Sequence, residues 1–229
     1  MEKLITENLV LRKARQADLE KIWKNDEPIG FAGIKEKEEG IYEVDKEMYY
    51  GTKIIYFVHG TTTDNAEKMC SGWKEAMLNE LGKEQAENLG KVIREKGIKF
   101  DILITSDLQR AIDSSDIAFP EYKKIRDNRL RECNYGDLDG KHKSLVIYEE
   151  HIESKFPNGE SLKDVEERMR DCIKSLKQNY PGKTIGIVAH RAPQLALEVI
   201  TKNITWEEAI KMDWRKTGDW QPGWEYIIE

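Results

Sequence analysis

The stretch Lys53-Ile54-Ile55-Tyr56-Phe57-Val58-His59-Gly60 decides the fold of this chain. It opens with an almost continuous apolar run, which is typical of a strand buried on both faces of a parallel sheet. The run ends abruptly at a histidine followed by a glycine. Ligands of parallel α/β sheets bind beyond the carboxyl ends of the strands, so the position of His59 alone makes it a candidate functional residue.

Two later segments repeat this pattern of an apolar strand that ends at polar side chains. Residues 100–104 are followed by Thr105-Ser106-Asp107, and residues 183–189 are followed by His190-Arg191. Helix patterns alternate with the strands, at residues 81–95, 108–118, 162–179 and 192–200. This alternation predicts an α/β fold with a mostly parallel sheet and helices on both faces. We expect His59, Ser106 and His190 to meet at one edge of that sheet.

The first 50 residues differ in pattern from the rest of the chain. They show short strand patterns at 9–11, 29–34 and 41–44, a helix pattern at 17–24 and a charged turn at 35–40. So few apolar residues cannot bury the area that an independent domain needs. We therefore expect an α+β appendage over residues 1–50 and one large domain over residues 51–229.

The composition argues against several classes of protein. A net charge of -6 disfavours nucleic acid as a partner, although a small phosphorylated substrate needs only a local positive pocket. Cys70, Cys133 and Cys172 lack the spacing of a zinc site or a disulfide framework, and they suggest reduced thiols of the cytoplasm. No segment approaches the roughly 20 apolar residues of a membrane helix, and we find no signal-peptide pattern. We expect a cytoplasmic protein without a membrane partner; its oligomeric state is not evident from the sequence.

A phosphoryl-transfer site that works without a metal has three chemical requirements. It needs a nucleophile that is unprotonated near neutral pH, and histidine meets this requirement. It needs cationic or donor groups to hold the phosphoryl oxygens, and an acid to protonate the leaving oxygen. The sequence shows no cluster of metal-ligating residues, so we expect neither a metal nor another cofactor.

Six motifs resemble, in order, those of the histidine phosphatase superfamily, which includes the cofactor-dependent phosphoglycerate mutases. They are His59-Gly60-Thr61-Thr62-Thr63-Asp64-Asn65, Ser71-Gly72-Trp73, Leu81-Gly82-Lys83-Glu84-Gln85-Ala86, Thr105-Ser106-Asp107-Leu108-Gln109-Arg110-Ala111, Leu130-Arg131-Glu132-Cys133-Asn134-Tyr135-Gly136-Asp137-Leu138-Asp139-Gly140 and Val188-Ala189-His190. Each motif alone is weak evidence, whereas their shared order across residues 54–229 is specific. The resemblance implies a metal-independent phosphatase that acts on a small phosphorylated substrate.

The resemblance also implies a role for individual residues. His59 is the nucleophile that becomes phosphorylated, and His190 stabilises the transferring phosphoryl group beside it. Glu132 is the general acid and later the base for the attacking water. The implied phosphate-binding residues are Arg110, Asn65 and Thr62.

The chain departs from the family pattern at one position of the site. The family has an arginine immediately before the nucleophile, where this chain has Val58. That arginine grips the phosphoryl group with two donors, a contribution of a few kcal/mol that valine cannot make. Arg191 stands where the family usually has a small residue, and we hypothesise that it restores the missing charge as a further phosphate-binding residue.

Several functions remain open at this point. The leading interpretation is a phosphomonoester hydrolase, because the loop after Glu132 is too compact to exclude water as a mutase does. A phosphoglycerate mutase-like phosphotransferase is one alternative, and a phosphate-binding pseudoenzyme disabled by Val58 is another. Trp73, Tyr135 and Trp224 are candidates for an apolar wall of the pocket.

The appendage carries a resemblance of its own. Residues 6–12 with 17–20, and 29–34 with 40–43, resemble the opening strand and helix and a central hairpin of a GCN5-related N-acetyltransferase. The glycine-rich loop that holds acetyl-CoA in that family is missing. We therefore interpret residues 1–50 as a truncated fragment and give acetyl transfer little weight.

Overall fold

The computed structural model describes residues 10–12, 23–24, 27–28, 34–38, 41–44, 51–218 and 221–228. The chain divides into two compact units, one of Met1–Gly51 with Glu229 and one of Thr52–Ile228. Each unit is described by itself below. The larger unit contains all the residues that the sequence proposes for the site.

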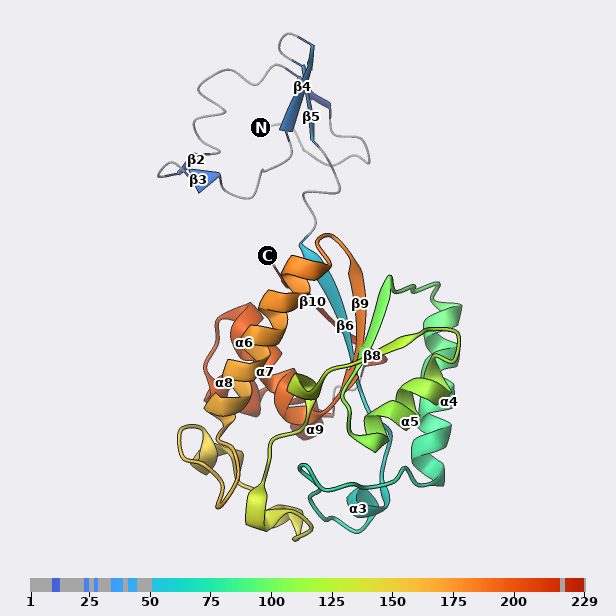
Figure 1. Cartoon of the computed structure of the whole chain (residues 1–229), viewed down its shortest axis with the longest axis vertical. Coiled ribbons are helices and arrows are strands. Elements are labelled where there is room, and N and C mark those ends of the chain that lie inside the picture. Colours follow the sequence, from blue (N-terminus) through green and yellow to red (C-terminus); the bar gives the residue numbers. More distant parts are fainter. Residues whose placement is uncertain are drawn as a thin grey trace. The chain divides into compact units, whose positions relative to one another are not determined.

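A five-stranded sheet forms the middle layer of the larger unit, in the order β10-β6-β9-β7-β8 (Figure 1). Its strands are β6 (Thr52–Val58), β7 (Ile102–Thr105), β8 (Lys124–Arg126), β9 (Thr184–Ala189) and β10 (Trp224–Ile228). The pairs β6–β9, β9–β7 and β7–β8 are parallel, and only β10 runs antiparallel to its neighbour. The mostly parallel sheet expected from the sequence is confirmed.

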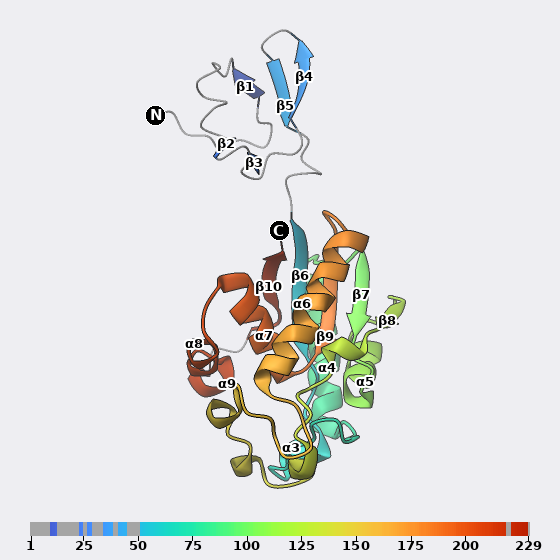
Figure 2. The same cartoon turned by 60° about the vertical axis from the view of Figure 1, so that its left-hand side comes forward.

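Helices cover both faces of this sheet, as Figures 1 and 2 show. On one face lie α4 (Glu80–Glu95) and α5 (Gln109–Ala118). On the other lie α6 (Leu162–Asn179), α7 (Arg191–Lys202) and α8 (Trp206–Lys211). The alternation of side chains along β6 produces the two layers, because Ile55 and Phe57 join the core under α4 and α5 while Ile54 and Tyr56 join the other core.

The strand register brings the ends of three strands to the same edge. Val58 pairs with Ala189, and Thr105 pairs with Val188. The residues that follow these strands therefore begin side by side, beside the short helix α3 (Thr63–Ala66). The larger unit also contains the short helices η1 (Asn128–Leu130), η2 (Gly136–Leu138), η3 (Lys143–Leu145), η4 (Tyr148–His151) and α9 (Trp214–Thr217).

The smaller unit corrects two expectations. Its strands are β1 (Val10–Arg12), β2 (Trp23–Lys24), β3 (Glu27–Pro28), β4 (Ile34–Glu38) and β5 (Ile41–Val44). The charged turn expected at 35–40 is wrong over its first four residues, which extend β4 because Lys35 and Glu36 pair with Glu43 and Tyr42 of β5. The helix expected at 17–24 is wrong at its end, where Trp23–Lys24 pairs with β3. The rest of that helix and residues 29–33 lie outside the described residues.

Candidate active site

His59 follows β6 and is half-buried. Its Nδ1 lies 2.7 Å from the carbonyl oxygen of Gly60. A carbonyl oxygen can only accept, so Nδ1 carries the proton and Nε2 keeps its lone pair. Burial and the positive charge of Arg110 lower the pKa of this imidazole to about 3. The side chain is thus neutral, with Nε2 as a potential nucleophile.

His190 follows β9, is fully buried, and lies beside His59 with the two ring centroids 5.0 Å apart. Its Nε2 lies 2.9 Å from the Oγ of Ser106. The same Oγ accepts a hydrogen bond from the backbone N–H of Leu108, so its own proton is available to Nε2. This arrangement makes Nε2 the acceptor of the His190 ring and leaves the proton on Nδ1.

The Nδ1 atom of His190 is buried and has no hydrogen-bond partner within the described residues. Leaving a buried donor unpaired costs about 1–3 kcal/mol, which a bound ligand oxygen would relieve. Burial, with the charge of Arg110, lowers the pKa of His190 well below its ordinary value. The two neutral imidazoles therefore offer complementary groups, a free acceptor on His59 and a free donor on His190.

The loop that carries His59 is held by close packing against the first turn of α4. A Cβ on Gly60 would overlap the carbonyl group of Gly82, and a Cβ on Gly82 would overlap the carbonyl oxygen of Thr61. The Oε1 of Gln85 accepts hydrogen bonds from both the backbone N–H and the hydroxyl of Thr61, at 2.9 and 3.0 Å. The motif at 81–86 therefore sets the position of the nucleophile.

Arg110 reaches the site from α5 and is almost completely buried. Its Nη2 donates to the carbonyl oxygen of Gly72 at 2.7 Å, and its Nη1 donates to that of Lys74 at 3.1 Å. Burial lowers its pKa from the ordinary value, partly offset by the negative charge of Glu132. Arg110 is thus a fixed cation whose charge acts on both histidines.

Glu132 lies at the N-terminus of α7. Its Oε1 accepts from the backbone N–H groups of Cys133 and Ala192, at 2.8 and 3.0 Å, and its Oε2 accepts from that of Arg191 at 3.1 Å. Free backbone donors and the helix dipole make a helix N-terminus a favourable place for a carboxylate. The residue before α7 is His190, so this contact brings the carboxylate next to the second histidine.

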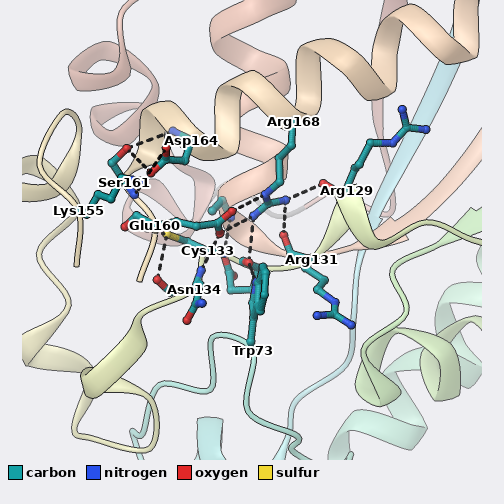
Figure 3. A network of polar contacts seen from close by, with 12 residues as sticks. Trp73, Arg129, Arg131, Cys133, Asn134, Lys155, Glu160, Ser161, Asp164 and Arg168 are labelled. Carbon is teal, nitrogen blue, oxygen red and sulfur yellow. Dashed lines mark hydrogen bonds and ion pairs between the residues drawn. The ribbon is translucent and has the colours of Figure 1, made fainter. Parts of the chain in front are cut away.

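Arg168 of α6 holds the segment that carries Glu132, as Figure 3 shows. Its Nη1 donates to the carbonyl oxygens of Arg129 and Arg131, at 2.6 and 2.8 Å, and its Nη2 donates to that of Glu132 at 3.0 Å. The same guanidinium pairs with Glu160, Nε to Oε1, at 2.9 Å. Only arginine offers several N–H donors in one rigid planar group, and Arg168 thus fixes the backbone on both sides of Glu132.

The remaining predicted residues lie nearby with other contacts. Thr62 and Asn65 form the capping box of α3: the Thr62 hydroxyl accepts from Asn65 N–H, and Asn65 Oδ1 accepts from Thr62 N–H. The Nε of Arg191 donates to the Oδ2 of Asp213 at 2.7 Å, and its guanidinium stacks on the ring of Tyr148 at 4.3 Å. The structure therefore places the Arg191 side chain on Asp213 and Tyr148.

The three aromatic residues expected in an apolar wall have different surroundings. Trp224 lines a cavity of about 370 Å³ beside His59, together with Val58 and Trp214. Tyr135 is buried, and its hydroxyl lies 2.7 Å from that of Tyr148. Trp73 is partly exposed and donates its indole N–H to the carbonyl oxygen of Glu132.

Sequence reasoning missed several residues that shape the site. The hydroxyl of Tyr56 donates to the carbonyl oxygen of His190 and accepts from its N–H, although Tyr56 reads as an ordinary residue of an apolar strand. Asp213 and Arg215 belong to no motif of the sequence. Only their position after α8 brings them beside α7, so no local signal could have indicated them.

Two further observations concern the described part of the chain as a whole. No helix there is long and apolar enough to cross a bilayer, and no group of three or more His, Cys, Asp or Glu side chains is arranged to hold a metal ion. Cys70, Cys133 and Cys172 are all buried and free.

Comparisons with known proteins relate this chain to one family. A family model described as histidine phosphatase superfamily (branch 1) matches residues 55–218. The phosphoglycerate mutase of Schizosaccharomyces pombe is 31% identical over 172 residues, which cover 68% of this chain and 82% of that protein. A 2,3-bisphosphoglycerate-dependent phosphoglycerate mutase of Chelativorans is 30% identical over 177 residues, covering 70% and 86%.

A solved structure shows the same fold. It is a mycobacterial glucosyl-3-phosphoglycerate phosphatase with a TM-score of 0.61 and 24% identity, covering 69% of this chain and 85% of that one. The family model spans well over half of the chain, and its match includes the strand, loop and helix segments that build the site. This chain belongs to the histidine phosphatase superfamily, branch 1.

Proposed function

We propose that the protein is a phosphomonoester hydrolase of the cytoplasm that acts through a phosphohistidine on His59. The observation that carries the proposal is the pair of neutral imidazoles, which offer a free Nε2 on His59 and an unpaired Nδ1 on His190 beside the buried Arg110. A nucleophile next to a fixed donor and a fixed cation is what phosphoryl transfer requires.

The proposed reaction has two steps. In the first, Nε2 of His59 attacks phosphorus, the bond from phosphorus to the ester oxygen breaks, and Glu132 gives its proton to the leaving alcohol. In the second, Glu132 takes a proton from water, the oxygen attacks phosphorus, and the bond to Nε2 breaks to release inorganic phosphate. His190 Nδ1–H and Arg110 stabilise the charge on the transferring oxygens in both steps.

The residues that the sequence indicates for phosphate binding have different roles in the proposed reaction. Asn65 keeps its Nδ2 amide outside the capping box, so it can donate to a phosphoryl oxygen. Thr62 is fully buried and caps α3, so it holds Asn65 in place. The backbone N–H of Arg191 holds Glu132, and the charge of the Arg191 side chain is considered below.

The proposal is tested with para-nitrophenyl phosphate and a panel of small phosphate esters. We expect the wild-type protein to release inorganic phosphate and His59→Ala to lose turnover by at least about a thousandfold. Brief incubation with a ³²P-labelled ester should give an acid-labile label on the wild type and none on His59→Ala. Tight binding of orthovanadate without any turnover would instead support a phosphate-binding pseudoenzyme.

A phosphoglycerate mutase is the second candidate, because relatives at 30% and 31% identity carry that name. The segment between Glu132 and α6, residues 133–161, favours hydrolysis, since it consists of short turns and single-turn helices with little mass to exclude water. Incubation with 3-phosphoglycerate and a trace of 2,3-bisphosphoglycerate separates the two. Formation of 2-phosphoglycerate faster than free phosphate would identify a mutase.

A further inference from the structure

The groups around His59 lack the charge that a phosphate monoester requires. His59 and His190 are neutral, and Glu132 carries a proton when it acts as the general acid, so Arg110 supplies a single formal positive charge among these four residues. A phosphate monoester carries a charge of about -1.5 to -2 near neutral pH. Desolvating such an anion without a compensating charge is costly, so binding at this site requires a further cation.

The side of β6 on which residue 58 lies indicates where such a cation fits. Tyr56 joins the core beneath α6 and α7, and Val58 packs against the same core. Phe57 belongs to the core on the opposite face. A cation from elsewhere in the chain that takes the place of an arginine at position 58 should therefore lie on the α7 side of the nucleophile.

That side holds a cluster of two arginines around one carboxylate. The side chain of Asp213 is completely buried. Its Oδ2 accepts from Nε of Arg191 at 2.7 Å, and its Oδ1 accepts from Nη1 of Arg215 at 2.9 Å. Two guanidinium groups share one negative charge, so the cluster keeps one net positive charge.

The two arginines of the cluster differ in their surroundings. Arg191 is held by the ionic bond to Asp213 and by the ring of Tyr148. Arg215, besides its bond to Asp213, donates its Nη2 to a neutral acceptor, the Oε1 of Gln194, at 3.2 Å. Its guanidinium lies over the ring of Trp214, at 4.3 Å, and Trp214 lines the cavity beside His59 and Val58.

The charge of Arg215 also acts on the nucleophile. Burial, then Arg110, and then Arg215 lower the pKa of His59, opposed by the hydrogen bond to Gly60. Arg215 acts likewise on Tyr56, whose hydroxyl holds the backbone of His190. Its charge is therefore within electrostatic reach of the atoms that transfer the phosphoryl group.

We propose that Arg215 is the second guanidinium of the phosphate site. Arg215 binds the phosphoryl group from the α7 side and provides the positive charge that Val58 lacks. This inference rests on the proposed function. Asp213 orients Arg215 and, because it also binds Arg191, leaves the charge of the cluster uncompensated until a phosphate ester arrives.

The test compares Arg215→Met, Arg215→Lys and the double variant Val58→Arg/Arg215→Met. We expect Arg215→Met to lower kcat/KM for para-nitrophenyl phosphate by about 100- to 1000-fold and to weaken orthovanadate binding, measured by calorimetry, by at least about tenfold. Arg215→Lys keeps the positive charge but loses the paired N–H donors of the guanidinium, so its kcat/KM and vanadate affinity should lie between those of the wild type and Arg215→Met. In the Arg215→Met background, Val58→Arg should raise kcat/KM at least about tenfold.

Two further variants complete the design. Arg170→Met removes an exposed arginine of α6 that pairs with Glu166, and it should behave as wild type. Arg191→Met should reduce vanadate binding less than Arg215→Met does. Melting temperatures identify variants that do not fold, and Arg215→Lys serves in place of Arg215→Met if the latter unfolds.

The outcomes distinguish a failure of the inference about Arg215 from a failure of the proposed hydrolase function. An active wild type with an Arg215→Met variant within twofold of it in kcat/KM and in vanadate affinity would overturn the inference alone. A folded Arg215→Met variant that Val58→Arg fails to rescue would overturn it as well. A wild type that neither hydrolyses any ester nor binds vanadate or inorganic phosphate would overturn both proposals.

Discussion

Single hydrogen bonds decide which ring nitrogen each histidine presents. The Gly60 carbonyl accepts from Nδ1–H of His59 and leaves Nε2 free, whereas the Ser106 hydroxyl donates to Nε2 of His190 and leaves its Nδ1–H without a partner among the described residues. Identical side chains thereby become an acceptor and a donor. The chemistry at the residue scale depends on these partners as much as on the histidines themselves.

We expect Ser106→Ala to lower kcat about tenfold, the equivalent of roughly 1.4 kcal/mol, with KM little changed. Without the hydroxyl, His190 can move its proton to Nε2 and lose the donor on Nδ1. Steady-state kinetics give the split between kcat and KM, and ¹⁵N chemical shifts of the imidazole report the tautomer. Ser144→Ala is the matched control, because it removes an exposed Ser–His hydrogen bond in which the Oγ of Ser144 lies 2.7 Å from the Nδ1 of His142. An unchanged tautomer in Ser106→Ala would contradict the assignment.

The lowered pKa values of both site histidines predict how stability depends on pH. Below about pH 6.5 the unfolded chain binds protons at these residues that the folded chain does not bind. Their contribution is therefore complete above pH 6.5 and is lost as the pH falls toward the folded value, which for His59 is about 3. Each histidine should lower the free energy of unfolding by about 1 kcal/mol per pH unit below 6.5.

Urea denaturation at intervals between pH 7.5 and 4.5 measures this slope. Removing one titrating group in His59→Gln should make the slope shallower than in the wild type. His142→Gln, at an exposed histidine, is the control and should leave the slope unchanged. Equal slopes for His59→Gln and the wild type would show that His59 titrates alike in the folded and unfolded chains.

At the scale of elements, the contact between α4 and the loop after β6 has the greatest consequence for the site. The backbone of Gly82 lies so close to Thr61 and Gly60 that neither glycine has room for a side chain. Gln85, one turn further on, holds Thr61 from the same helix. The first turn of α4 is therefore part of the nucleophile's support.

Gly82→Ala should push α4 away from this loop. We expect a loss of about 1–3 kcal/mol in stability and at least a tenfold fall in kcat/KM, since small misplacements of a nucleophile are expensive. Lys83→Ala removes only an exposed ion pair with Glu80 and should be nearly neutral in both measurements. Thermal unfolding and para-nitrophenyl phosphate kinetics check both variants; equal behaviour of the two would contradict the close-packing account.

For the whole molecule, the division at Gly51 predicts independence of the larger unit. The unit Thr52–Ile228 contains both cores, the complete sheet and every residue of the proposed site. We propose that residues 1–50 are an appendage that resembles part of an acetyltransferase and that takes no part in hydrolysis.

A chain of residues 52–229 should therefore keep kcat/KM for para-nitrophenyl phosphate within about threefold and its melting temperature within about 5 °C of the full-length protein. The full-length chain is the control, measured in the same buffer. A much larger loss of activity or stability would assign the first 50 residues a role in the site or in the core.

The sequence predicted the larger unit well where local and tertiary preferences agree. The helix at 162–179 matches α6 residue for residue, and the three apolar runs became β6, β7 and β9 within a few residues. The prediction failed where a short segment pairs with a distant or neighbouring strand, as in β4, β8 and β10. Such segments form strands because a partner edge is available, which no local pattern records.

The sequence by itself determined the family, the parallel arrangement of β6, β7 and β9, and the choice of His59, Arg110, Glu132 and His190 as proposed site residues, because apolar periodicity and ordered motifs are properties of the chain. Only the tertiary structure decided which ring nitrogens are free, how α7 receives Glu132, and that Asp213 joins Arg191 and Arg215. These depend on contacts between segments far apart in the sequence, where the geometry of packing, rather than any local preference, determines which charges and hydrogen bonds meet.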